Sequence, residues 1–332
     1  MAIFRRLPVL DWLQVEVTTY CNASCRYCPH TVYRARWVSR HLPMETFAKL
    51  LPAVKRSRLV FLQGWGEPFL NPDFFAMATL AGKEGCAVGT TTNGMLLDEE
   101  KAARLVDTGV DVVAFSLAGT GAMNDFWRRG THLDQVLKAI KNLAAEKARR
   151  RTAKPAIHVA YMLLRSGLYE LKTLPDLLAG TGVREVVISV LDFIPAPDLV
   201  KEVVTLEDDA ATRMLLQEVV EAGRERGLAI HYRVPRPAGG TSCAENATRA
   251  AFIAADGSLS PCVFTNLPLS EIPAGNDGSG TAYHKVTFGN VSQEPFGAIW
   301  NRRAYREFRA SLAAGVPPAV CRSCPRLYLE TV

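Results

Sequence analysis

Three cysteines near the start of the chain have the spacing of an iron–sulfur ligand set. Cys21, Cys25 and Cys28 form the pattern Cys-x3-Cys-x2-Cys directly after the first predicted strand. Three thiolates on one loop can bind three irons of a [4Fe–4S] cube, whereas a ferredoxin-type cluster takes a fourth thiolate. One iron is then open to another ligand, which makes the cluster reactive. The alternative is a zinc site, for which His30 is the available fourth ligand.

Four more cysteines lie near the other end of the chain. Four thiolates leave no iron of a second [4Fe–4S] cluster open, which favours electron transfer or structural support over substrate binding. A structural zinc site with the same four ligands is the alternative. The members of this set are Cys243, Cys262, Cys321 and Cys324. The eighth cysteine, Cys86, stands alone at the start of a predicted strand, where we expect an ordinary buried thiol.

Polar and glycine-rich turns follow the second, third and fourth predicted strands. Glycine lets a ligand approach the backbone closely, and carbonyls or a carboxylate can accept hydrogen bonds from an amine. The second strand leads into Gly64-Trp65-Gly66-Glu67-Pro68, the third into Thr91-Thr92-Asn93-Gly94, and the fourth into Ser116-Leu117-Ala118. Their order and spacing relative to the cysteines indicate one composite site.

Six apolar segments typical of buried strands alternate with helical segments. The strands are predicted at residues 12–18, 58–63, 87–91, 111–117, 156–163 and 185–191, and the helices at 43–54, 72–85, 98–108, 133–149, 168–180 and 206–227. Repeated βα units imply a parallel sheet with right-handed crossovers, either doubly wound or curled into a barrel. In such folds the chemistry lies at the carboxyl ends of the strands, where the cysteine loop and the polar turns fall.

The sequence changes character near residue 235. A linker-like stretch at 235–241, PRPAGGT, leads into an irregular region rich in Gly, Pro and Asn, with one clear helix predicted at 296–312. We therefore expect two domains, residues 1–235 and 236–332. The second domain has few long apolar runs, so a metal centre held by its four cysteines would stabilise it.

Composition bounds the class of protein. Apolar residues make up 48% of the 332 residues and charged residues 22%, so a sizeable core can form. We expect a cytoplasmic protein without a membrane partner, because the chain has no long apolar run and its first residues lack a signal peptide. In that compartment cysteines serve metals or redox chemistry more often than disulfides. The net charge is +6, but no basic stripe interleaved with aromatics indicates nucleic-acid binding.

The first cysteine motif, with Tyr27 directly before its last cysteine, resembles that of the radical S-adenosylmethionine (SAM) superfamily. The resemblance implies an α/β fold, a partial (β/α)6 TIM-like barrel, in which SAM chelates the open iron through its amino and carboxylate groups. It also implies that a flavodoxin- or ferredoxin-type donor reduces the cluster. One electron then cleaves SAM to methionine and a 5′-deoxyadenosyl radical, which abstracts a substrate hydrogen.

The same resemblance assigns cofactor contacts. The segment after the second strand is similar to the family's GGEP segment, which holds the SAM amino group. Asn93 matches the family's TNG turn, and Ser116 matches a hydroxyl often used near the ribose. The usual Asp after the Ser-Leu pair is replaced here by Ala118. The implied cofactor contacts are Tyr27, Gly64, Gly66, Glu67, Pro68, Asn93 and Ser116.

The second cysteine set, with Gly257 five residues before Cys262, resembles the SPASM/twitch extensions of radical SAM enzymes. Full SPASM domains carry more cysteines and two auxiliary clusters. Four cysteines here imply a shortened form, a small irregular C-terminal iron–sulfur domain with one auxiliary [4Fe–4S] cluster.

Together these features predict an oxidative enzyme, in which the substrate radical loses an electron to the auxiliary cluster. The substrate is predicted to be a small polar metabolite or a carbohydrate. The alternatives are a peptide- or protein-modifying maturase and modification of a tungsten or molybdenum pterin cofactor, because residues 61–68 and 116–120 look like those of proteins that modify the cofactor of tungsten aldehyde oxidoreductases. An electron carrier would explain the cysteines but not the SAM-binding turns. Candidate substrate contacts are His158, expected to point inward, Ser189, His231 and Arg233.

Overall fold

The computed structural model describes residues 8–204, 210–232, 242–271, 283–322, 324 and 326–328. Within them, one curved sheet has ten strands in the order β11-β10-β9-β1-β2-β3-β4-β5-β6-β7, and β8 pairs separately with β12. The strands are β1 (Leu10–Val15), β2 (Ser57–Leu62), β3 (Ala87–Thr92), β4 (Val112–Leu117), β5 (Ala156–Leu163), β6 (Glu185–Val190), β7 (Ala229–Tyr232), β8 (Ser242–Cys243), β9 (Ala250–Ile253), β10 (Ser258–Ser260), β11 (Gly289–Asn290) and β12 (Leu327–Tyr328).

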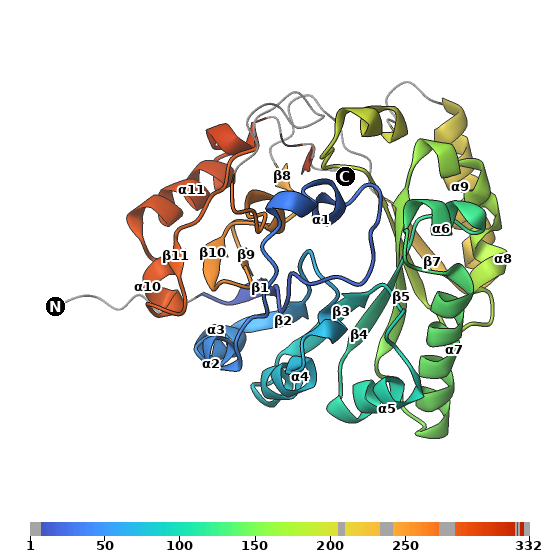
Figure 1. Ribbon diagram of the computed structural model, residues 1–332, viewed down its shortest axis with the longest axis horizontal. Coiled ribbons are helices and arrows are strands. Elements are labelled where there is room, and N and C mark those ends of the chain that lie inside the picture. The colour runs from blue at the N-terminus through green and yellow to red at the C-terminus, as the bar shows by residue number, and fades with distance from the viewer. Residues whose placement is uncertain are drawn as a thin grey trace.

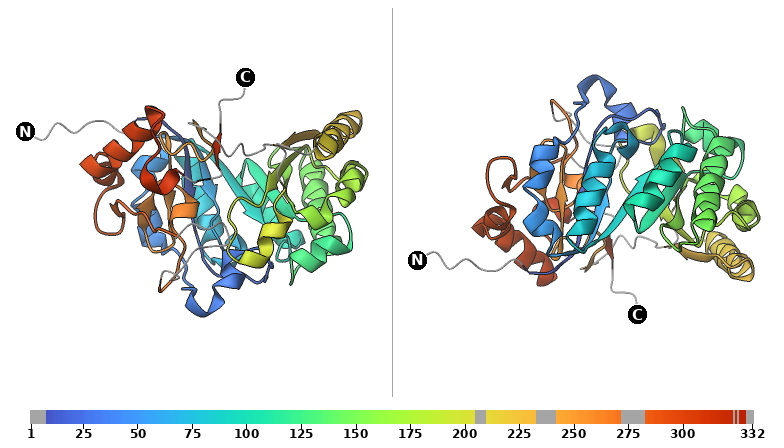
Figure 2. Two further views of the ribbon diagram at one scale, coloured as in Figure 1. Left: turned by 90° about the horizontal axis from the view of Figure 1, so that it is seen from above. Right: turned by 90° about the horizontal axis from the view of Figure 1, so that it is seen from below.

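The strands β1 to β7 pair in parallel with their neighbours, so their carboxyl ends share one edge of the sheet. The sheet curls while its outermost strands, β11 and β7, stay apart, and helices cover its convex face (Figures 1 and 2). This arrangement confirms the partial TIM-like barrel and excludes the doubly wound alternative, which would carry helices on both faces.

Each predicted helix is present, but three of them are interrupted, and α1 and α6 were not predicted. They are α1 (Pro29–Val32), α2 (Met44–Ala48), α3 (Leu51–Val54), α4 (Phe74–Lys83), α5 (Glu99–Thr108), α6 (Ala122–Trp127), α7 (Leu133–Arg149), α8 (Leu174–Leu178), α9 (Ala210–Glu225), α10 (Phe296–Trp300) and α11 (Arg303–Ala313). The helix expected at 43–54 breaks before Pro52, and the one at 168–180 begins as a 3-10 turn before Pro175. Proline favours a first turn because it lacks an N–H. The helix expected at 296–312 breaks at Arg302, which is extended.

The core lies between the sheet and the outer helices. On β5, Ile157, Val159, Tyr161 and Leu163 are almost fully buried and belong to this core. His158, Ala160 and Met162 alternate with them and therefore face the inside of the barrel. The structure thus orients His158 inward, as the alternation predicts.

The region after residue 242 continues the barrel sheet. β9 lies parallel to β1, with Trp12 opposite Ala250 and Val15 opposite Ile253. β10 and β11 then extend the sheet in antiparallel fashion, and α10 and α11 flank this edge (Figure 1). The predicted domain boundary after residue 235 falls outside the described residues and stays a prediction.

Candidate active site

The first cysteine loop lies at the carboxyl edge of the sheet, between β1 and α1 (Figure 1). Cys25 is 8% exposed, and Cys21 and Cys28 are half-buried. Two hydrogen bonds shape the loop, from the Cys28 N–H to the Cys25 carbonyl (3.1 Å) and from the Ala23 N–H to the Cys21 Sγ (3.4 Å). The structure therefore brings the three predicted ligands together on one turn.

Burial makes isolated thiolates costly in this loop. It raises the pKa of Cys21 to about 11, and the negative charges of Glu67 and Cys25 add to the shift. Burial is also the main cause of the raised pKa of Cys28. The charge of Cys25 is the next largest cause and raises that pKa further. A positively charged iron centre would offset these penalties, because metal ligation favours the deprotonated thiol.

The zinc alternative is weakened by the position of His30. His30, the fourth ligand that zinc would need, packs edge-on against Trp37 with ring centroids 5.1 Å apart. Three thiols that share a loop without a fourth ligand fit the three-cysteine cluster.

The glycine-rich turn after β2 lies directly against the cysteine loop. A Cβ atom on Gly66 would overlap the carbonyl oxygens of Thr18 and Tyr20, so only glycine fits there. The Glu67 N–H donates to the Tyr20 carbonyl at 2.8 Å. Pro68 starts the 3-10 turn Pro68–Leu70 and is buried. The predicted cofactor turn and the predicted cluster loop thus form one unit.

The carboxylate of Glu67 fastens this turn to the end of β3. One oxygen accepts the Thr92 hydroxyl and the other accepts the Asn93 N–H, both at 2.7 Å. Glu67 is 2% exposed, and burial raises its pKa to about 7 although these hydrogen bonds oppose the shift. Its contact with SAM stays a prediction, and its observed role is to hold two turns together.

Asn93 connects the same assembly to the cysteine loop. Its side-chain N–H donates to the side-chain oxygen of Asn22, which lies between Cys21 and Cys25 (2.7 Å). Its oxygen accepts the Met95 N–H at 3.0 Å, and Gly94 takes a positive φ of 83° to close the turn. Asn22 is a member of the site that the sequence motifs did not single out.

The strands β4 and β5 leave space beside these turns. Ser116 is half-buried on the inner face of β4, opposite Ala160 of β5. Ala114 lies on the same inner face, so small side chains line this part of the barrel. Ala118, which replaces the family's Asp, is 2% exposed and packs in an apolar cluster with Cys25, Tyr27 and Trp127.

Two buried charged residues extend the site beyond the sequence motifs. Glu16, fully buried at the end of β1, accepts the N–H of Trp65 (2.9 Å) and that of Ala255 (3.1 Å). Burial raises its pKa to about 7. Arg128, at the end of α6, donates from Nη1 to the hydroxyl of Tyr27 at 2.8 Å. The only sequence signal for Glu16 is a carboxylate inside an apolar strand.

The four cysteines of the second set also come together. Cys243 pairs with Leu327 across β8 and β12, and the Cys324 N–H donates to the Cys321 carbonyl at 3.0 Å. Burial raises the pKa of Cys262, and the charges of Cys243 and Cys324 contribute. The pKa of Cys321 rises to about 12 through burial and then through Cys324 and Cys243. Cys262, Cys321 and Cys324 therefore each lie close enough to another thiol of the set for its charge to affect their pKa.

Aromatic side chains join the two halves of the site. The ring of Trp65, inside the glycine-rich turn, lies 5.9 Å from that of Phe264 and 6.3 Å from that of Phe193. Phe264 is two residues from Cys262. The buried Nε1–H of Trp65 has no acceptor within the described part of the chain.

An ion pair between Asp192, just after β6, and Arg326 adds a second link between the two halves of the site. Arg326 also pairs with Glu245 at 2.6 Å.

The remaining substrate candidates separate into two places. Ser189 and His231 line a cavity of about 670 Å³ together with Asp192, Tyr232 and Arg326. His158 lies 3.9 Å from Glu185, which begins β6, so it lies at the amino end of the barrel, away from the cysteine loop. Arg233 lies outside the described residues. Cys86 is buried in the main core, as expected for an ordinary thiol.

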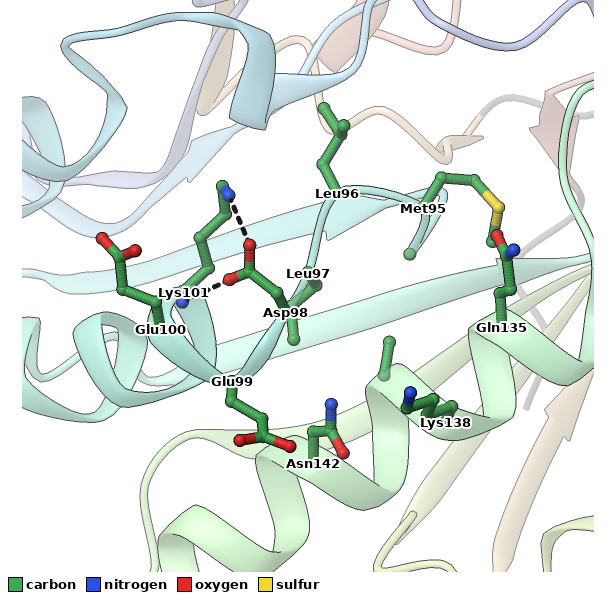
Figure 3. A pocket seen from close by; sticks show the side chains of 12 residues that line it. Met95, Leu96, Leu97, Asp98, Glu99, Glu100, Lys101, Gln135, Lys138 and Asn142 are labelled. Carbon is green, nitrogen blue, oxygen red and sulfur yellow. Dashed lines mark hydrogen bonds and ion pairs between the residues drawn. The ribbon is translucent and has the colours of Figure 1, made fainter.

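A second hollow, of about 660 Å³, lies between α5 and α7 on the outside of the barrel (Figure 3). Asp98 caps α5 by accepting the Lys101 N–H at 2.8 Å and also pairs with the Lys101 ammonium at 3.0 Å. These groups satisfy each other, and we assign no chemistry to this groove.

Comparisons with known proteins agree with this geometry. The model of the radical SAM superfamily matches residues 15–164, and that of the SPASM iron–sulfur cluster-binding domain matches residues 243–325. The cofactor-modifying protein of the tungsten-containing aldehyde ferredoxin oxidoreductase from Pyrococcus furiosus is 26% identical over 307 residues, covering 90% of this chain and 83% of that protein. The pre-heme d1 synthase of Dinoroseobacter shibae is 25% identical over 349 residues, covering 96% and 82%. SuiB of Streptococcus suis bound to SAM has a similar fold, with a TM-score of 0.66, 14% identity and coverage of 92% and 68%.

Fold and site together define an enzyme that uses SAM and a [4Fe–4S] cluster. The chain belongs to the radical SAM superfamily and carries a SPASM iron–sulfur domain at its C-terminal end. It is a modifying enzyme. Among the described helices, none has the length and apolar character needed to cross a bilayer.

Proposed function

We propose that Cys21, Cys25 and Cys28 hold the SAM-binding cluster and that Cys243, Cys262, Cys321 and Cys324 hold a second [4Fe–4S] cluster. The grouping of the four thiols beside the aromatic contact from Phe264 to Trp65 carries this proposal. With its cofactors bound, the enzyme delivers one electron to SAM, releases methionine, and removes a substrate hydrogen atom as 5′-deoxyadenosine. A cluster held by Cys243, Cys262, Cys321 and Cys324 would supply an acceptor for one electron, so that loss of one proton to solvent would complete a net oxidation of the substrate.

The residues of the site position these components. Gly64 and Gly66 let their turn pack tightly against the end of the strand β1 and the cysteine loop, and the Glu67 carboxylate keeps the turn fixed against Asn93. SAM is proposed to bind along this fixed turn. The small inner faces of Ser116 and Ala160 leave room for the nucleoside of SAM. Trp65 and Phe264 close the space between the two cysteine sets against water.

We propose a small ring-containing cofactor precursor as the substrate. Two relatives that cover most of this chain modify the cofactor of a tungsten enzyme and make pre-heme d1, according to their names. Trp65, Phe193 and Phe264 are only partly buried, and aromatic rings favour stacking against flat ligands. The unpartnered Trp65 Nε1–H is suited to a ring nitrogen or oxygen. This class takes precedence over the carbohydrate expected from the sequence, which no described contact favours.

The experiment uses anaerobically reconstituted protein with dithionite and SAM, and measures 5′-deoxyadenosine. We expect about eight irons per chain from two cubes and about four in Cys25→Ala or in Cys262→Ala. Cys25→Ala should form no 5′-deoxyadenosine, whereas the buried control Cys86→Ala should form it normally. An active Cys25→Ala protein would overturn the ligand assignment. Pterin, tetrapyrrole, sugar and peptide candidates are then compared for a substrate-dependent increase in 5′-deoxyadenosine, and an increase with only a sugar or a peptide would overturn the substrate class.

The electron donor is proposed to dock beside the first cysteine loop. Arg26, inside the loop, is exposed and lies over the ring of Phe126, with its guanidinium 4.1 Å from the ring centroid. Phe126 is 47% exposed, and Arg129 beside it accepts the Ser24 N–H through its carbonyl at 2.7 Å. Neither Arg26 nor Arg129 forms an ion pair with a described residue. Exposed cations around an apolar ring suit an acidic flavodoxin- or ferredoxin-type protein.

A further inference from the structure

Arg128 is a buried cation without a carboxylate partner. Its side chain is 7% exposed and lies where α6 ends, behind the first cysteine loop. Nη1 donates to the Tyr27 hydroxyl at 2.8 Å, while the buried Nε has no hydrogen-bond partner in the described part of the chain. No described Asp or Glu forms an ion pair with it. A buried charge in this state is costly unless an opposite charge compensates it.

The opposite charge available to Arg128 lies in the cysteine loop. Tyr27, to which Arg128 donates, packs in one buried cluster with Cys25, and Cys21 and Cys28 pack against that cluster. The carboxylate of Glu67 interacts electrostatically with Arg128, but its oxygens already accept hydrogen bonds from Thr92 and Asn93. The guanidinium is therefore held against thiols and not against an acid.

A purely structural role would predict different consequences. The Arg128 backbone does stabilise the loop end, because its N–H donates to the Asn124 carbonyl and its carbonyl accepts the Thr131 hydroxyl, both at 2.8 Å. These contacts survive replacement of the side chain. A side chain needed only for packing would also be satisfied by an apolar residue of similar length, with no effect on redox behaviour.

We propose that Arg128, held in place by Tyr27, is a positioning residue that supplies the counter-charge for the thiolate-bound cluster at Cys21, Cys25 and Cys28 and favours its one-electron reduction. This inference rests on the ligand assignment made above. Reduction adds one negative charge to the cluster, and the electron comes from dithionite or the low-potential donor protein. A fixed cation in a poorly solvated site stabilises the more negative state.

The test isolates the first cluster in full-length protein that carries Cys262→Ala and Cys324→Ala. Iron content and the electron paramagnetic resonance signal are measured during a potential titration without SAM. We expect Arg128→Met to bind iron but to show a roughly tenfold lower ratio of reduced to oxidised cluster at a fixed potential. Arg128→Lys keeps the charge and should recover most of this loss, and Tyr27→Phe should give a partial loss. Arg306→Met, which replaces an exposed arginine of α11, is the matched control.

Unchanged reduction in an iron-loaded Arg128→Met protein would overturn the proposal. If that variant does not fold, Arg128→Lys and Tyr27→Phe decide the question. A Lys variant with the wild-type titration and a shifted Phe variant support the counter-charge, whereas a wild-type titration in the Phe variant overturns it. Failure of the ligand assignment itself would appear separately, as full iron content and an unchanged signal after adding Cys25→Ala.

Discussion

The side-chain amide of Asn93 donates a 2.7 Å hydrogen bond to the side-chain oxygen of Asn22. Asn93 follows β3, whereas Asn22 lies inside the cysteine loop after β1. The backbone N–H of Asn93 is held at the same time by Glu67, in the turn after β2. One asparagine therefore fixes the relative positions of three motifs that the sequence presents separately.

This contact predicts that SAM affinity depends on the pair. Asn93→Ala and Asn22→Ala should each weaken SAM binding to the cluster-loaded protein, because the cysteine loop loses its tie to β3. The double variant should lose less SAM binding free energy than the sum of the two single losses. The difference, or coupling energy, should be about 1 kcal/mol, the usual size for one hydrogen bond. Equilibrium dialysis with labelled SAM measures this, and Asn142→Ala in the outer groove of Figure 3 is the control. Strictly additive losses would show that the two residues act independently.

A second prediction concerns Gly66. Alanine there would push its Cβ into the Thr18 and Tyr20 carbonyls, which belong to backbone and cannot turn away. Gly66→Ala should reduce SAM affinity at least tenfold, or about 1.4 kcal/mol. Gly82 of α4 is the matched control, because a Cβ there meets nothing within 4 Å. Gly82→Ala should keep SAM binding and raise the free energy of unfolding by about 0.5–1 kcal/mol. Normal SAM affinity in Gly66→Ala would contradict the close contact.

Local patterns were sufficient to predict β1 to β6 and to group the cysteines into two sets, but they did not predict β7 or the short strands β8 to β12. Buried parallel strands read as apolar runs, and thiolate ligands of one loop are close in sequence. The helix breaks before Pro52 and Pro175 also have a local cause, because a proline stands in the first turn of α3 and of α8. At Arg302 the cause is tertiary, because its guanidinium bonds to Phe288 and Glu294 while its backbone is extended.

The long-range contacts of the site could not be predicted in the same way. Arg128 meets Tyr27 across 101 positions in the sequence, and Glu16 meets Ala255 across 239. In the sequence Arg128 is one of many arginines, and only its burial in the structure distinguishes it from the exposed Arg129. Such partners depend on how the loops of neighbouring strands pack, which no motif of a single segment encodes.

Glu16 leads to a prediction about pH. Its pKa is raised from 4.5 to about 7 in the folded protein, so between these values the folded state binds a proton that the unfolded chain releases. Its contribution to the free energy of unfolding is therefore complete below about pH 4.5 and is lost as the pH rises through about 7. In Glu16→Gln this titration is absent. Relative to the variant, wild type should lose at most about 3 kcal/mol between about pH 5 and about pH 8.

Anaerobic thermal unfolding of the cluster-loaded proteins across this pH range measures the difference. The pKa of Glu67 is also raised to about 7, but Glu67 titrates in both proteins. Its contribution to the free energy of unfolding therefore cancels in the comparison. Glu100→Gln, an exposed residue of α5, should follow wild type at every pH. Parallel curves for wild type and Glu16→Gln would mean that the buried carboxyl does not change its protonation state here.

The last prediction separates donor docking from cluster chemistry. Arg26→Glu and Arg129→Glu reverse charges beside the cysteine loop without replacing a predicted ligand. With a reduced flavodoxin as the electron source, we expect 5′-deoxyadenosine formation to slow about tenfold and to lose most of its dependence on salt, because steering by opposite charges disappears. With dithionite, which needs no protein docking, both variants should match wild type. Arg306→Glu on α11, also exposed, controls for the change in net charge. Slow turnover with both electron sources would instead place Arg26 or Arg129 in the support of the cluster loop itself.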